Sequence, residues 1–159
     1  MADMLVKLFD LQGDETDRKS LLKDNIEIVR AMPSDKQRIV GWVKDNFGES
    51  WASECDVAFS NKPVSCFVAI QNQKSIIGFA CYEATCKDFF GPTGVLEGYR
   101  GRGIGTVLLL QSLQSMKDTG YAYAIIGGAD ESAVDFYKKT VNAYIIEGSS
   151  PGIYKNSLG

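Results

Sequence analysis

Short apolar runs along the chain alternate with stretches in which apolar side chains recur every three or four positions. The runs predict strands over residues 25–30, 65–70, 75–83, 86–96, 121–126, 143–147 and 152–156. The helical spacing predicts helices from residue 34, over 50–59, from 104 to about 117, and over 131–140. Proline cannot donate to a ladder, so Gly91-Pro92 predicts a bulge or a strand start inside the run 86–96. The order βααβββαβαββ predicts an α/β domain with helices flanking the sheet.

The N-terminal residues follow this pattern only weakly. Residues 1–11 predict a short strand or arm, and residues 14–20 are charged and predict a turn-like break. We therefore expect an arm over residues 1–24, packed on the body or on a second subunit, and one domain over residues 25–159. Because the arm could pack on a second subunit, a homodimer is one of the expected alternatives.

The segment 95–106 holds four glycines and two arginines, directly before the helix predicted from residue 104. Glycine allows positive φ and close approach of the backbone to a ligand, and the first N–H groups of a helix attract negative charge. Arg100 and Arg102 can add charge-assisted hydrogen bonds. We expect a ligand that carries phosphate, most simply a pyrophosphate, held by Gly101, Arg102, Gly103, Ile104, Gly105 and Thr106.

The loop does not match either of two common nucleotide-binding motifs. A Walker loop counted from Gly98 needs lysine where Ile104 stands, and a dinucleotide fingerprint counted from Gly101 needs glycine where Thr106 stands. A plain turn between a strand and a helix is the remaining alternative. The density of glycine and arginine at a helix start argues against it.

Composition narrows the chemistry further. With a net charge of −3, the chain has no excess of basic residues that would indicate nucleic-acid binding. No apolar run is long enough to span a membrane. The N-terminus lacks the pattern of a signal peptide, so a cytoplasmic protein is expected. Histidine is absent, which removes His-based triads and nearly all conventional zinc sites, so no metal is expected. The four cysteines form no C-x-x-C pair, and buried reduced thiols are the favoured interpretation.

Two motifs resemble one known family. Arg100-x-x-Gly103-x-Gly105 matches the acyl-CoA loop of the GNAT (GCN5-related) N-acetyltransferases, and residues 130–139 are similar to that family's N-x-x-A-x-x-F-Y-x-K segment. The order of predicted elements is also that of this family. The resemblance implies a GNAT-like α/β domain with a splayed, mixed central sheet flanked by helices, and acetyl-CoA as co-substrate. It implies transfer of the acetyl group to a primary amine by direct attack, with a small amine, in particular an amino sugar, as acceptor. The alternative is an acyl-CoA-binding sensor or interaction module without catalysis.

The resemblance also implies roles for single residues. Val95 and Leu96 would hydrogen-bond the pantetheine arm through their backbone, and Tyr137 matches the tyrosine that donates a proton to the CoA thiolate. Glu83, at the end of a predicted strand, is the first candidate for the general base. Asp130 is the second candidate, although it stands where the family often has asparagine and could instead cap the following helix.

Overall fold

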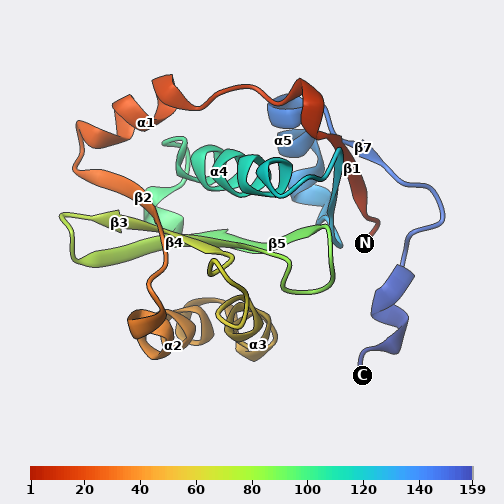
Figure 1. Cartoon of the computed structure of the whole chain (residues 1–159), viewed down its shortest axis with the longest axis horizontal. Helices are drawn as coiled ribbons and strands as arrows, with labels where there is room; N and C mark the ends of the chain where they lie inside the picture. Colours follow the sequence, from red (N-terminus) through yellow and green to blue (C-terminus); the bar gives the residue numbers. More distant parts are fainter. Residues whose placement is uncertain (159) are drawn as a thin grey trace.

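Seven strands form one mixed sheet in the computed structural model, which describes residues 1–158 (Figure 1). The order across the sheet is β2-β3-β4-β5-β6-β1-β7, and every neighbouring pair is antiparallel except β5 with β6. The strands are β1 (Met4–Lys7), β2 (Ile26–Arg30), β3 (Cys66–Gln71), β4 (Ser75–Tyr82), β5 (Phe89–Val95), β6 (Tyr123–Ile126) and β7 (Tyr144–Ile145).

Helices cover both faces of this sheet (Figure 1). On one face lie α1 (Glu15–Leu22) and α4 (Ile104–Asp118), with α5 (Glu131–Val141) beside them, and on the other lie α2 (Lys36–Phe47) and α3 (Glu49–Ala58). The short helices η1 (Leu8–Asp10), η2 (Pro33–Asp35), η3 (Glu97–Tyr99) and η4 (Gly152–Asn156) lie in the connections. The sheet is thus buried on both sides, which explains why its central strands read as continuous apolar runs.

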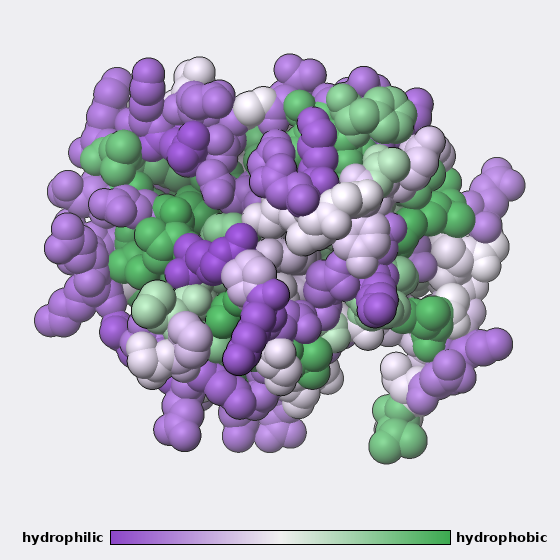
Figure 2. Space-filling model, in the orientation of Figure 1, coloured by the Kyte–Doolittle hydropathy of each residue, from purple (hydrophilic) through white to green (hydrophobic). Residues whose placement is uncertain are grey.

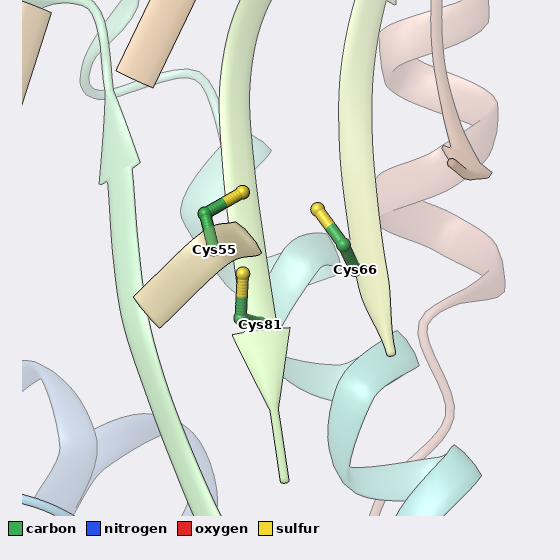
Figure 3. Close-up of side chains that lie close together, drawn as sticks. All are labelled: Cys55, Cys66 and Cys81. Atoms are coloured by element: carbon green, nitrogen blue, oxygen red, sulfur yellow. The ribbon is translucent and has the colours of Figure 1, made fainter. Parts of the chain in front are cut away.

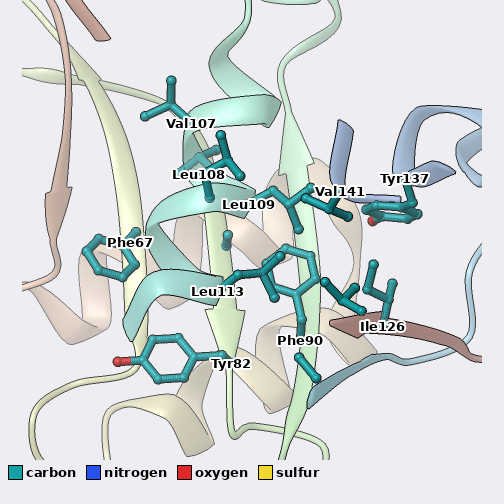
Figure 4. Packing of buried hydrophobic residues seen from close by; sticks show 14 of the residues in the cluster. Phe67, Tyr82, Phe90, Val107, Leu108, Leu109, Leu113, Ile126, Tyr137 and Val141 are labelled. Carbon is teal, nitrogen blue, oxygen red and sulfur yellow. The ribbon is translucent and has the colours of Figure 1, made fainter. Parts of the chain in front are cut away.

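Each face has its own apolar core. On the first, Leu108, Leu109 and Leu113 of α4 pack with the buried rings of Phe67 and Phe90 (Figure 4). On the second, a separate cluster joins α2 and α3 to β3 and β4. Polar side chains cover the outer surfaces of α1 and α2 (Figure 2), as expected for helices that bury only one side.

The sheet splays between β5 and β6, as the resemblance implies. Phe89 and Phe90 are the only β5 residues paired with β6. Directly after them, the register between β4 and β5 shifts, so that Gly91 and Pro92 lie in a bulge. Because Pro92 has no N–H to donate, β5 leaves its parallel partner here and continues to Val95 beside β4 alone.

The N-terminal residues are part of this sheet and form no separate arm. β1 lies between β6 and β7, antiparallel to both, so residue 24 marks no structural boundary. The predicted break at residues 14–20 is wrong, because α1 occupies that segment. Its sequence is polar, and contacts at its start stabilise it: Arg18 pairs locally with Asp14 at 2.9 Å, and Gln111 of α4 donates to Asp14 at 2.8 Å, which is a tertiary contact.

The last predicted strand is also wrong. Residues 152–156 form η4, since Gly152 has a φ of +58° and Tyr154 turns in against Gly127 and Gly128. The other predicted strands and helices are present. Within residues 1–158, no helix combines the length and apolarity needed to cross a bilayer.

Candidate active site

The separation of β5 from β6 opens a cleft of about 920 Å³. This volume lies within the range of small-molecule sites. One part of its wall comes from the start of α4 and from α5, on one face of the sheet. Another part comes from Trp51 and Glu54 of α3, on the opposite face. The cleft therefore extends to both faces of the sheet.

The glycine loop forms the wall at the start of α4. Gly101 and Gly103 have φ values of +80° and +88°, which only glycine adopts readily. The N–H of Val107 donates to the carbonyl of Gly103, so the N–H groups of Ile104, Gly105 and Thr106 have no acceptor within the helix. These residues line the cleft together with Arg100. They form a set of donors suited to an anion.

The second arginine of the loop is placed differently from the first. The guanidinium of Arg102 lies over the ring of Tyr99, 5.1 Å from its centre, and Arg102 is not part of the cleft wall. Arg100 donates through Nε to the carbonyl of Val95 at 3.1 Å and lines the cleft. Arg100 is thus the cation at the cleft, while Arg102 lies outside it.

The free edge of β5 supplies further backbone groups. Leu96 donates its N–H to Ile77 at 2.9 Å and accepts from Tyr99 at 2.9 Å, so both of its backbone groups are used within the protein. The N–H of Leu96 is therefore not free for the predicted hydrogen bond to a ligand. The alternation of an antiparallel ladder then turns the N–H groups of Val95 and Thr93 away from β4, toward the space that β6 has vacated.

Tyr137 lies on α5, at the border between the apolar core and the cleft (Figure 4). Its side chain is packed near Ile126 and Val141, and burial raises its pKa to about 12. Among the described residues, none forms a hydrogen bond with the Tyr137 hydroxyl, and burial alone accounts for the raised pKa. The tyrosine therefore stays protonated at neutral pH and can donate to a ligand in the cleft.

Glu83, the first candidate base predicted from the sequence, is not among the residues that line the cleft. It lies in the turn after β4 with a φ of +56°, where its Oε1 accepts the N–H of Asp88 at 3.3 Å. Its carboxylate also raises the pKa of Tyr121 to about 12 through a hydrogen bond. These contacts assign Glu83 to the structure of the turn.

Asp88, in the same turn, predicts a pH-dependent change in stability. Burial, and then the neighbouring Glu83 carboxylate, raise its pKa to about 6, and its Oδ1 is buried without a hydrogen bond among the described residues. A raised pKa in the folded state means that the ionised form destabilises the fold, so stability falls as the pH rises from about 4 to 6. Asp88→Asn should raise Tm by up to about 2–4 °C near pH 7.5.

Scanning calorimetry at two pH values checks this prediction. The advantage of Asp88→Asn should vanish near pH 4, where the wild-type carboxyl is protonated in both states. An equal Tm difference at both pH values would show that the side-chain amide, and not the charge, is responsible.

The sequence did not single out Glu54, which supplies a carboxylate to the cleft from α3. Thr85 donates its hydroxyl hydrogen bond to Oε1 of Glu54, and the carboxylate helps to raise the pKa of nearby Tyr154, after burial. Asp130 adds a second carboxylate at the start of α5. Its side chain makes no capping bond and accepts from Ser132 instead, so the cap interpretation is not supported.

Comparisons with known proteins agree with this architecture. The acetyltransferase (GNAT) family model matches residues 36–142. A glucosamine N-acetyltransferase region of a fungal multi-domain β-N-acetylglucosaminidase is 18% identical, with a TM-score of 0.73 over 91% of this chain and 19% of that chain. A GCN5-related N-acetyltransferase from Sphaerobacter thermophilus is 18% identical, with a TM-score of 0.68 over 91% and 48%.

A GNAT acetyltransferase from Brucella melitensis, solved with acetyl-CoA, is 19% identical, with a TM-score of 0.51 over 71% of this chain and 82% of that chain. The chain spans less than half the length of the fungal and Sphaerobacter proteins. No curated protein matches the sequence. At these identities, the structural likeness establishes the fold.

Proposed function

The chain belongs to the acetyltransferase (GNAT) family, and from this premise we propose that it transfers the acetyl group of acetyl-CoA to a primary amine by direct attack. The observation that carries the proposal is the splay of β5 from β6, with anion donors beside it and carboxylates across the sheet. Direct transfer needs two substrates side by side and no nucleophile from the protein. The absence of histidine is compatible with this reaction.

The glycine loop would hold the pyrophosphate of acetyl-CoA. A Cβ on Gly101 would meet no atom within 4 Å, and one on Gly103 would meet only Asp17, at 3.8 Å, so the space above the loop is open. The free N–H groups of Ile104, Gly105 and Thr106, the positive end of α4 and Arg100 all favour a diphosphate here. The residues of the glycine loop therefore fit the pyrophosphate of acetyl-CoA.

The free edge of β5 would bind the extended pantetheine arm. The N–H groups of Val95 and Thr93 face the gap, so an amide-bearing chain can pair with this edge as a missing strand would. The same edge would bring donors to the thioester oxygen, on which negative charge develops during attack. We retain Val95 from the sequence prediction, add Thr93 and omit Leu96.

Tyr137 would act as the general acid. The leaving thiolate of CoA needs a proton donor, and Tyr137 is a tyrosine of the cleft wall, on α5, whose raised pKa keeps it protonated. Glu54 is our candidate for the general base, with Asp130 second, because both carboxylates line the cleft. A base on α3 would accept the proton of an amine that approaches from the face opposite to α4.

The acceptor would be a small cationic amine. Two carboxylates in one cleft favour an ammonium group, and the ring of Trp51 offers a face on which an amino sugar can stack. The structural likeness to the fungal glucosamine N-acetyltransferase region makes amino sugars the first class to test. The second candidate function is an acyl-CoA-binding module without turnover.

The decisive experiment measures CoA release from acetyl-CoA against a panel that contains glucosamine, polyamines, amino acids and peptides. We expect thiol release with one class of amine, and acetyl-CoA binding by calorimetry. If acetyl-CoA does not bind, the proposal is wrong. Binding without turnover across the panel would favour the non-catalytic module.

Glu54→Gln tests the assignment of the base. Loss of a general base costs about 10²–10⁴-fold in rate, so we expect kcat/KM for the amine to fall within this range while acetyl-CoA affinity is kept. The loss should shrink at high pH, because the amine then deprotonates in solution. Glu49→Gln, on the same helix with a largely exposed side chain, is the matched control. A normal rate in Glu54→Gln together with a loss in Asp130→Asn would move the base to Asp130.

A further inference from the structure

Three of the four cysteines meet on the sheet face that α2 and α3 cover (Figure 3). Cys66 and Cys81 lie on β3 and β4, and Cys55 approaches them from α3. Their Sγ atoms all lie within 4.8 Å of one another, and each residue has 0% exposure. None of them lines the cleft, so the proposed acetyl transfer does not use them.

Regular elements fix this arrangement. Tyr82 donates its backbone N–H to Ser65, so the next pair along the ladder, Cys66 with Cys81, is a non-hydrogen-bonded pair, whose side chains lie closest together. Cys55 occupies the buried side of α3. Donors on strands and helices hold their geometry better than donors on loops, so the three sulfurs are positioned in advance.

The surroundings of the three thiols limit what they can bind. Their neighbours form an apolar cluster that includes Val43, Val64 and Phe79. In the part of the chain that the structure describes, no further histidine, cysteine or carboxylate joins the group. Structural zinc sites almost always have four ligands, and only three are present here. An ion that binds two sulfurs would leave the third thiol unused. Three sulfur donors with no fourth partner favour a three-coordinate, thiophilic centre.

The net charge of the complex then distinguishes between the metal ions or metalloids that three thiolates could bind. Three thiolates bring three negative charges into an apolar core, where an uncompensated charge is costly. The charged side chain that acts on Cys55 is the Asp56 carboxylate, which adds no positive charge. A monovalent or divalent ion leaves net negative charge, whereas a trivalent centre gives a neutral complex. We propose that Cys55, Cys66 and Cys81 form a binding site for a trivalent thiophilic metalloid of the arsenite class.

The binding step balances without an oxidant. Three S–H groups react with As(OH)₃ to give As(SR)₃ and three water molecules: three As–O bonds break, three As–S bonds form, and arsenic keeps its oxidation state.

The test uses the reduced whole chain and sodium arsenite under exclusion of oxygen. We expect native mass spectrometry to show one arsenic per chain, and X-ray absorption at the arsenic edge to show three sulfur neighbours. Since the site is closed, the protein is also refolded from denaturant with arsenite present, so that slow entry cannot hide binding. Cys55→Ala, Cys66→Ala and Cys81→Ala should each weaken binding by more than about tenfold.

Cys86→Ala is the matched control, because Cys86 lies outside the cluster and is partly exposed. It should bind arsenite like the unmodified chain, and circular dichroism verifies that each variant is folded. Several results would overturn the proposal: no adduct after refolding, two sulfur neighbours, or equal loss in Cys86→Ala. Stoichiometric binding of Zn²⁺ in preference to arsenite would overturn the charge argument. Each readout is independent of acetyl transfer.

Discussion

Tyr137→Phe is expected to lower kcat for acetyl transfer by about 10²–10⁴-fold, the range for loss of a general acid. The substitution removes one oxygen and keeps the ring that packs in the apolar core beside Ile126 and Val141. The leaving thiolate then has no protonated side chain to donate to it from α5. Because the hydroxyl makes no hydrogen bond within the described residues, its removal should leave folding intact.

Steady-state kinetics and calorimetry together separate this loss from a binding defect. We expect acetyl-CoA affinity to change little, so the effect should appear in kcat and not in the dissociation constant. Tyr123→Phe is the matched control, since Tyr123 is an exposed tyrosine of β6 outside the cleft. Unchanged kcat in folded Tyr137→Phe would remove Tyr137 from the mechanism.

The raised pKa of Tyr137 adds a test of pH dependence. Burial holds the pKa at about 12, so the acid is fully protonated across the usual assay range. The alkaline limb of the rate profile should therefore not report this group. A loss of activity centred on the ordinary tyrosine pKa of about 10, absent from Tyr137→Phe, would show that ligand binding changes the environment of the ring.

Gly103→Val is expected to weaken CoA binding by about 10- to 100-fold, because a hydrogen bond to a charged phosphate contributes about 1.5–3 kcal/mol. Valine at a φ of +88° is strained, and relief of this strain moves the N–H groups at the start of α4 away from the anion. The branched side chain would also enter the open space above the loop.

The fold should survive this change. The only atom within 4 Å of an added Cβ is Asp17 Oδ1, at 3.8 Å, so we expect no core clash and a stability loss of about 1–2 kcal/mol from the backbone alone. Gly98→Val is the matched control in the same loop, because Gly98 has no positive φ and a Cβ there meets nothing within 4 Å. Calorimetry with CoA measures both variants. An unchanged affinity in folded Gly103→Val would contradict the role of the loop.

Much of the fold was accessible from local patterns. The helix from Ile104 and the buried strands β3 and β4 follow from apolar spacing, which reports the face that each element buries. The bulge at Gly91-Pro92 follows from the chemistry of proline. By contrast, α1 was missed because its polar sequence has almost no apolar periodicity, and its stability comes from Asp14 and its contact with Gln111, a partner far along the chain.

Some features of the candidate site were likewise predictable from the sequence, and others were not. The sequence by itself predicted the glycine loop that we propose to bind an anion, and the tyrosine of α5, because each motif is contiguous and its spacing carries the chemistry. Only the tertiary structure decided which carboxylates reach the cleft. It placed Glu54 in the wall and Glu83 in a turn, and it brought Cys55, Cys66 and Cys81 together. The physical reason is that side-chain direction and long-range strand pairing depend on how the sheet is assembled, and local spacing does not encode that assembly.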